Sequence, residues 1–176
     1  MRALPAVLAA CLALAACSEG RESPEIVLPV MVSSEAQHHF GATLSGDEEV
    51  PANASRARGS AIFKLSDDGA TLHYRLVVAN IEGVTQSHIH IAPAGSNGPV
   101  VVFLYGFNAA GTSRSGVLAE GEITASKLIA RPAIGFGATM PELVQRMRAG
   151  NAYVNVHTLA IPPGEIRGQI DVRGKP

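Results

Sequence analysis

Apolar and polar residues alternate in short runs along this chain from about residue 40 onward. In the segment 71–80, for example, Leu72 and Leu76 fall on one side of the alternation, and His73 and Arg75 fall on the other. Successive side chains of a strand point to opposite faces, so this pattern is typical of strands with one buried face. It predicts strands over residues 40–45, 59–66, 71–80, 87–91, 100–105, 116–123, 152–158 and 165–172.

One helix is predicted between these strands. Thr139-Met140-Pro141-Glu142 has the spacing of a capping box, and proline is tolerated in the first turn of a helix. Leu143, Val144 and Met147 then form an apolar stripe, and Gly150 is a natural C-terminal stop.

Tight turns separate the predicted strands. Asp67-Asp68-Gly69 is a strong hairpin signal, because Asp and Gly accept positive φ angles. The chain has 18 Gly, 11 Pro and no Trp, which suits short strands joined by turns. We therefore expect an all-β sandwich or barrel of seven to nine antiparallel strands in two sheets, with one short helical crossover.

The N-terminus has the features of an export signal. Residues 1–16 combine Arg2 with an apolar run that ends in small residues. Leu14-Ala15-Ala16-Cys17 resembles the bacterial lipobox, in which the cysteine is lipidated; the alternative is an ordinary secretory signal cut near the same place. We expect a signal at 1–16, a lipidated Cys17 with a flexible tether over 17–37, and a domain over 38–176. The apolar patch 26–32 fits either an edge strand or part of the tether.

This organisation places the protein in the cell envelope, held by its lipid at the outer membrane or the periplasmic face. It also restricts the chemistry, because the chain has only two cysteines: Cys11 leaves with the signal and Cys17 carries the lipid. Any metal site in the domain must then use nitrogen and oxygen ligands. The 14 Lys and Arg against 15 Asp and Glu form no basic patch, which argues against a nucleic-acid partner.

Histidines occur in two distant strand segments, Ser87–Ile91 and Tyr153–Thr158. By parity, His88 and His90 share one face of the first segment, and His157 shares a face with Asn155 in the second. If the branched apolar residues face the core, all three histidines point away from it, toward solvent or a cleft.

Three converging imidazoles without a thiolate would suit copper(II) or zinc, with a position open to water or substrate. Asn155 and Glu165 are candidate hydrogen-bond partners of the ligands, and Arg167 shares the face of Glu165. Alternatively, the histidines hydrogen-bond loop backbone and Asn155 and hold one end of the sandwich together. Glu165 and Arg167 are also expected to form an ion pair or a loop anchor rather than a catalytic pair.

Other polar groups are expected to be solvated. His38-His39 lies where the tether meets the domain, and His73 lies on an outward strand face. Asp47-Glu48-Glu49 lacks the spacing of a calcium loop and is predicted to be a solvated turn. No catalytic residue is assigned, because no nucleophile triad, phosphate loop or paired-carboxylate motif occurs.

Several of these segments together resemble the CHRD domain, the module named after chordin that also occurs in bacterial secreted proteins. The segments are Phe40–Pro51, Gly83–Ile91, Gly150–Thr158 and Gly164–Ile170. The resemblance covers about residues 40–172 and implies an immunoglobulin-like, Greek-key β-sandwich or barrel. The family has no settled enzymatic activity. Chordin binds secreted growth factors, but a bacterial lipoprotein need not inherit that partner.

A looser similarity is to copper–zinc superoxide dismutase, in which a His-x-His strand supplies copper ligands. This chain has no matching bridging histidine, zinc-site aspartate or loop disulfide, which counts against dismutase activity.

The sequence is compatible with three hypotheses about function. The first is a lipid-anchored, non-enzymatic module that binds a protein or small ligand in the envelope, in its sharpest form with copper or zinc at His88, His90 and His157. The second is a redox or hydrolytic metalloenzyme at the same site. The third is a structural or adhesion module without a metal.

Overall fold

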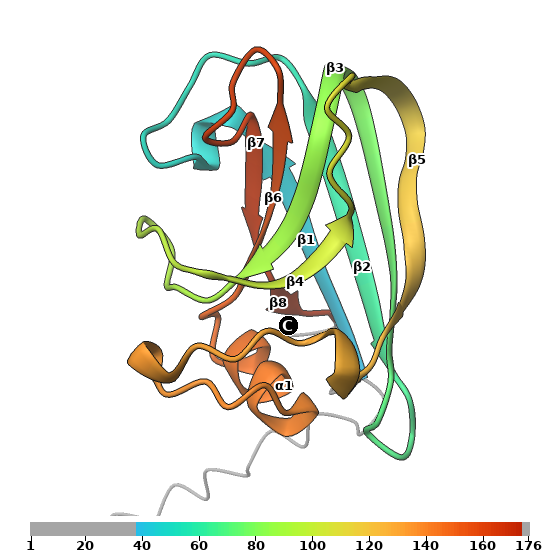
Figure 1. Cartoon of the computed structure of the whole chain (residues 1–176), viewed down its shortest axis with the longest axis vertical. Coiled ribbons are helices and arrows are strands. Elements are labelled where there is room, and N and C mark those ends of the chain that lie inside the picture. The colour runs from blue at the N-terminus through green and yellow to red at the C-terminus, as the bar shows by residue number, and fades with distance from the viewer. Residues whose placement is uncertain (1–37, 174–176) are drawn as a thin grey trace, which may run out of the picture. The chain divides into compact units, whose positions relative to one another are not determined.

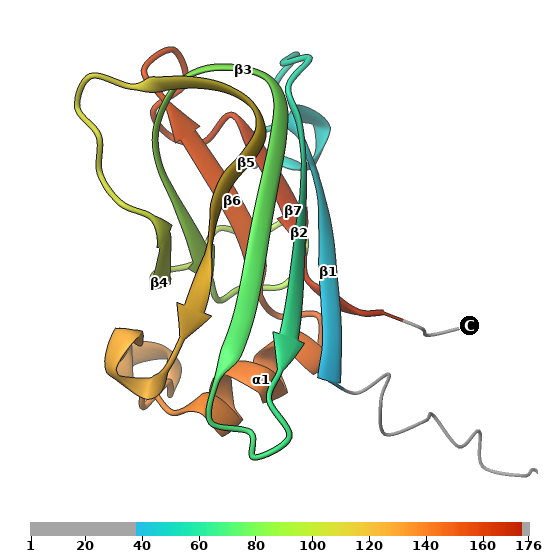
Figure 2. The ribbon, with the colours of Figure 1, turned by 90° about the vertical axis from the view of Figure 1, so that its right-hand side faces the viewer.

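The structure, a computed structural model, describes residues 38–173, and this part of the chain is a small closed β-barrel with extra strands and one α-helix (Figures 1 and 2). The strands are β1 (His39–Ser45), β2 (Arg58–Leu65), β3 (Leu72–His90), β4 (Val100–Tyr105), β5 (Thr112–Ile123), β6 (Tyr153–Thr158), β7 (Ile166–Gln169) and β8 (Asp171–Val172). The helices are α1 (Met140–Arg148) and the short 3-10 turns η2 (Gly46–Glu48), η3 (Ala125–Lys127) and η4 (Pro132–Ile134). No helix within residues 38–173 is long and apolar enough to cross a membrane.

The barrel closes through β3, a strand of 19 residues. Its first half lies between β2 and β5, and its second half lies between β6 and β4. The remaining order, β2-β1-β7-β6, joins the two halves of β3 into a ring. At about 3.3 Å per residue the strand has a contour length of roughly 60 Å, and it bends over one end of the barrel (Figure 2). It changes partners at an irregular stretch in which Asn80 (φ 54°) and Gly83 (φ 63°) have positive φ angles.

The alternation along the strands separates a core face from an outer face. Leu72, Leu76 and Val78 of β3 are buried, whereas His73 is exposed. The amphipathic helix α1 lies across one end of the barrel and buries Leu143 and the other residues of its apolar stripe. These residues join one hydrophobic cluster with the inward residues of the strands.

The all-β class and the single helix are confirmed, but three details of the predicted organisation need correction. All eight strands belong to one connected sheet rather than two, because β3 pairs with both ends of the strand order. The segments 71–80 and 87–91 are one strand, since the Glu82-Gly83 break bends the chain without ending its pairing. The last predicted strand is divided into β7 and β8. The immunoglobulin-like Greek-key arrangement stays a prediction.

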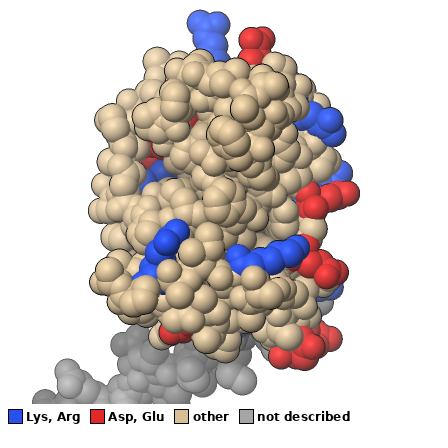
Figure 3. Space-filling view, in the orientation of Figure 1, with Lys and Arg blue, Asp and Glu red and all other residues tan. Residues whose placement is uncertain are grey.

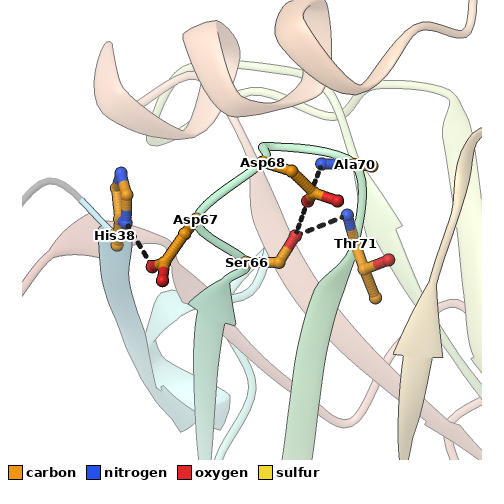
Figure 4. A network of polar contacts seen from close by, with 6 residues as sticks. All are labelled: His38, Ser66, Asp67, Asp68, Ala70 and Thr71. Atoms are coloured by element: carbon orange, nitrogen blue, oxygen red, sulfur yellow. Dashed lines mark hydrogen bonds and ion pairs between the residues drawn. The ribbon is translucent and has the colours of Figure 1, made fainter.

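The predicted hairpin turn is confirmed between β2 and β3 (Figure 4). Gly69 has φ 71°, and its N–H donates to the carbonyl of Ser66 at 2.9 Å. The Asp68 carboxylate accepts from the Ser66 hydroxyl at 2.6 Å and from the Ala70 N–H at 3.0 Å. These hydrogen bonds, that of Ser66 first, lower the pKa of Asp68.

The predicted signal 1–16, the tether 17–37 with Cys17, and the patch 26–32 lie outside the described residues. Their structure therefore stays a prediction from the sequence.

The capping box of α1 is confirmed and gives a test of the fold. The Glu142 N–H donates to the Thr139 hydroxyl at 3.4 Å, and the Thr139 N–H donates to the Glu142 carboxylate at 3.1 Å. We expect Thr139→Ala to lower the free energy of unfolding by about 1 kcal/mol, measured by urea denaturation. Thr124→Ala is the control, because Thr124 precedes η3 without a capping hydrogen bond from its side chain, and it should cost less. Equal losses in the two variants would contradict the assignment.

Candidate metal centre

Antiparallel pairing of β3 with β6 brings the two histidine segments together. In this register His88 lies opposite Asn155, and His157 lies opposite Gln86. Ile89, Val154 and Val156 point to the other face, where each is fully buried in the core. The predicted parity is therefore observed in both strands.

His88, His90 and His157 form what we call the histidine cluster. One ring nitrogen from each residue can be chosen so that all three lie within 4.8 Å of one another. The closest pair is His88 Nδ1 and His157 Nε2, at 3.1 Å. It is the only group of three or more His, Cys, Asp or Glu side chains with metal-ligand spacing found within residues 38–173.

Two loop carbonyls fix the tautomers of the cluster. His90 Nδ1 lies 2.9 Å from the carbonyl oxygen of Gly98, and His157 Nδ1 lies 2.8 Å from that of Pro162. A carbonyl oxygen only accepts, so both Nδ1 atoms carry the proton and both Nε2 atoms carry a lone pair. His88 then donates from Nδ1 to His157 Nε2, which leaves the Nε2 of His88 as a lone pair as well.

Within residues 38–173, four buried side-chain atoms have no hydrogen-bond partner among the protein atoms: Nε2 of His88, Nε2 of His90, Ser87 Oγ and Asn155 Oδ1. Buried polar atoms without partners are uncommon in folded proteins and call for an explanation. A metal ion would supply one, because ligating histidines usually donate their other ring N–H to a carbonyl, as His90 and His157 do here.

Burial keeps the rings neutral. It lowers the pKa of His88 to about 3, and the neighbouring His157 and His90 add to this effect. It lowers the pKa of His90 to about 4, against the opposing hydrogen bond to Gly98. The pKa of His157 is also lowered, again chiefly by burial. All three are therefore neutral at pH 7, the form that binds metals.

To hold an ion, the three rings must move closer together and the His88–His157 hydrogen bond must open. Metal–nitrogen bonds of about 2.0–2.1 Å place tetrahedral ligand nitrogens roughly 3.3 Å apart. The observed separations reach up to 4.8 Å, so the rings would move slightly inward. Copper and zinc both accept imidazole donors.

The sequence allowed the histidines to face either solvent or a cleft, and the structure excludes the first of these. His88 is 3% exposed, and His90 and His157 are each 8% exposed. The Phe103 ring meets His88 edge-on with ring centroids 4.5 Å apart. Tyr153 stacks on His90 at 4.7 Å. The outward face of the strands is thus covered by aromatic rings and by the loops that supply Gly98 and Pro162, a cover that strand parity cannot reveal.

The other predicted site residues have partners outside the cluster. The Asn155 amide donates to both oxygens of Glu49, at 3.2 and 3.1 Å. The Glu165 carboxylate accepts from the hydroxyls of Ser55 (2.7 Å) and Thr158 (2.6 Å). Asn155 therefore binds Glu49, and Glu165 binds Ser55 and Thr158. The rings of His90 and His157 are held instead by the carbonyls of Gly98 and Pro162.

Arg167 is buried against the loop 91–99 and does not pair with Glu165. It donates to the carbonyl of Ser96 at 2.9 Å and to the Asn97 side chain at 3.3 Å. Its guanidinium lies 3.4 Å from the centre of the Tyr153 ring. Because Tyr153 also stacks on His90, an arginine, a tyrosine and a histidine are layered beside the cluster.

Glu49 is a buried carboxyl that the sequence did not reveal. It was expected in a solvated turn, yet it is 7% exposed. Burial raises its pKa to about 7, although Arg167 and the Asn155 hydrogen bonds act in the opposite direction. Gly164 covers this pair: with φ 145°, a Cβ added there would lie 2.7 Å from Glu49 Oε1. The Pro163-Gly164 turn was the only local signal for this close approach.

The remaining histidines lie elsewhere. His38 Nδ1 is 3.8 Å from Asp67 in the β2–β3 hairpin (Figure 4), and His73 Nδ1 is 3.5 Å from Glu122. His39 opposes Lys64 across β1 and β2. None of the three belongs to the cluster.

Comparison with known protein families shows which family the chain belongs to. The family model for the CHRD domain matches the sequence over residues 40–170. This range is most of the chain and contains the whole histidine cluster.

This chain belongs to the CHRD-domain family. The earlier resemblance is thereby confirmed, and the barrel described above is the CHRD domain of this protein. No curated protein and no solved structure matches the chain.

The buried Glu49 of this CHRD domain gives a pH prediction. A pKa raised in the folded state means that stabilisation is complete below the unfolded pKa of about 4.5 and is lost as the pH rises through about 7. Glu49→Gln should remove this loss. The variant should gain up to about 3 kcal/mol relative to the parent protein between pH 4 and pH 8, measured by urea denaturation.

The matched control is Glu48→Gln, because Glu48 is the exposed neighbour. Its stability difference from the parent should be nearly independent of pH. A difference for Glu49→Gln that also stayed flat would show that Glu49 is not a buried, titrating group.

Proposed function

We propose that this CHRD-domain protein is a non-enzymatic binding module of the cell envelope that holds one copper or zinc ion at His88, His90 and His157. The export signal and the lipobox ending at Cys17 support an envelope location with a lipid anchor in the membrane. Membership of the CHRD family supports a binding role.

The pair of buried, partnerless Nε2 atoms carries the metal proposal. A cluster serving only as internal hydrogen-bond partners would be expected to satisfy both nitrogens of each ring. Instead, loop carbonyls hold one nitrogen of His90 and of His157, while the Nε2 atoms of His88 and His90 lack partners. Because the rings are neutral, none has to lose a positive charge before it coordinates an ion. The His157 lone pair accepts from His88 Nδ1, so that hydrogen bond must open for His157 to become the third ligand.

Burial also favours binding over catalysis at this site. A metalloenzyme needs a ligand position that a substrate can reach. Here the Nε2 atoms of His88 and His90 are buried, and the Phe103 and Tyr153 rings lie against the imidazoles. The metalloenzyme hypothesis therefore remains the alternative.

The test is metal analysis of the protein purified without an affinity tag, alongside a His88→Gln/His90→Gln variant. We expect about one equivalent of copper or zinc in the parent protein and at least a tenfold lower content in the variant. Glutamine keeps a polar side chain of similar length, and circular dichroism would establish that the variant is folded.

His73→Gln is the matched control, because His73 is an exposed histidine outside the cluster. It should retain the full metal content. Equal metal content in the cluster variant and the parent would refute the proposed site.

A further inference from the structure

The histidine cluster offers an ion no negative charge. Its three donors are neutral imidazoles, and the group contains no carboxylate or thiolate. No acidic side chain is among the groups that influence the pKa of His88 or His90. The charge of a bound ion would therefore stay uncompensated by its ligands.

Two arginines act on the charge of the cluster through His90. Arg167 and Arg131 both act to lower the pKa of His90. Arg167 is 2% exposed and lies over the Tyr153 ring that stacks on His90. Arg131 donates from Nε to the carbonyl of Val100 at 2.7 Å, and Val100 is the strand partner of His90.

The carboxyl groups of this region, buried Glu49 and partly buried Glu165, have other partners. Glu49 is bound by Asn155, and burial brings its pKa to about 7, so it is partly uncharged at neutral pH. Glu165 is bound by Ser55 and Thr158. On the face of the domain drawn in Figure 3, the upper part is largely uncharged, and Lys and Arg side chains lie across the lower half.

An uncharged, buried site discriminates between ions by their charge. The cost of moving an ion out of water rises with the square of its charge, so a divalent ion pays about four times as much as a monovalent one. Repulsion from the two arginines rises linearly and is twice as large for the divalent ion. Divalent ions usually recover this cost from anionic ligands or bound water, whereas here aromatic rings cover the ligands.

Coordination number points in the same direction. Cuprous copper has a filled d shell and is satisfied by three nitrogen donors, the number this cluster supplies. Copper(II) favours a tetragonal set of nitrogen and oxygen ligands, and zinc favours four ligands.

We propose that the histidine cluster selects the cuprous ion over copper(II) and zinc. This inference rests on the proposed metal-binding function and assigns the ion to it.

The test compares affinities for single ions in the protein purified without a tag. Copper(I) is titrated without oxygen in competition with bicinchoninate, and zinc and copper(II) are titrated against chromogenic chelators of divalent ions. We expect copper(I) to bind at least about 100-fold more tightly than zinc or copper(II).

A charge variant isolates the cause. Phe103 is 48% exposed and packs against His88, so Phe103→Glu would place a carboxylate beside the cluster. Attraction to that carboxylate is twice as large for a divalent ion. The Phe103→Glu variant should therefore bind zinc about tenfold more tightly than the parent protein does. The ratio of its copper(I) affinity to its zinc affinity should fall accordingly.

Phe107→Glu is the matched control. Phe107 is 72% exposed in the loop after β4, and a carboxylate there should leave the ratio of copper(I) affinity to zinc affinity unchanged.

The outcomes separate the two proposals. Zinc or copper(II) bound as tightly as copper(I), or more tightly, would overturn the cuprous preference and leave the metal site standing. Failure of the protein to bind any of the three ions would overturn both.

Discussion

The alternation of side chains along β3 is the constraint on which this structure depends. One strand closes the barrel by pairing with β2 and β5 in its first half and with β6 and β4 in its second. The same alternation sends Ile89 into the core and His88 to the outer face. A register shift by one residue would exchange these faces, so the packing of the core also fixes the position of the candidate site.

Three loops position the backbone carbonyls that bind the histidine rings. The loop 91–99 supplies the Gly98 carbonyl, and the turn after β6 supplies that of Pro162. These loops are tied to the segment after β1, because Asn97 donates to the carbonyl of Val50 and Asn53 donates to that of Glu165. The tautomers of buried histidines are thus set by backbone groups whose positions depend on contacts between distant parts of the chain.

Local patterns predicted local structure well. The capping box at Thr139, the hairpin at Gly69 and the parity of His88 with His90 each depend on a few adjacent residues. The closure of the barrel was not predicted. It requires β3 to pair with β2 in its first half and with β6 in its second half, whereas Gly83 suggested that the strand ends there.

Features formed by distant residues escaped prediction. The burial of Glu49 depends on Asn155 and Gly164, which are more than 100 residues away in the sequence. The carbonyls of Gly98 and Pro162 have no side-chain signature. Histidine type and spacing therefore predicted the cluster, while its cover, its charge surroundings and its hydrogen-bond partners required the structure.

The central claim is that the three histidines are neutral, with the ring tautomers fixed by their hydrogen bonds. Long-range ¹⁵N–¹H NMR of the imidazole rings tests it directly. We expect His88, His90 and His157 to carry their proton on Nδ1. Burial lowers all three pKa values, so His88 and His90 should show no titration between about pH 5 and pH 8, and His157 should titrate below its ordinary value. Titration of these three rings near pH 6.5, or a proton on Nε2 of His90 or His157, would contradict it.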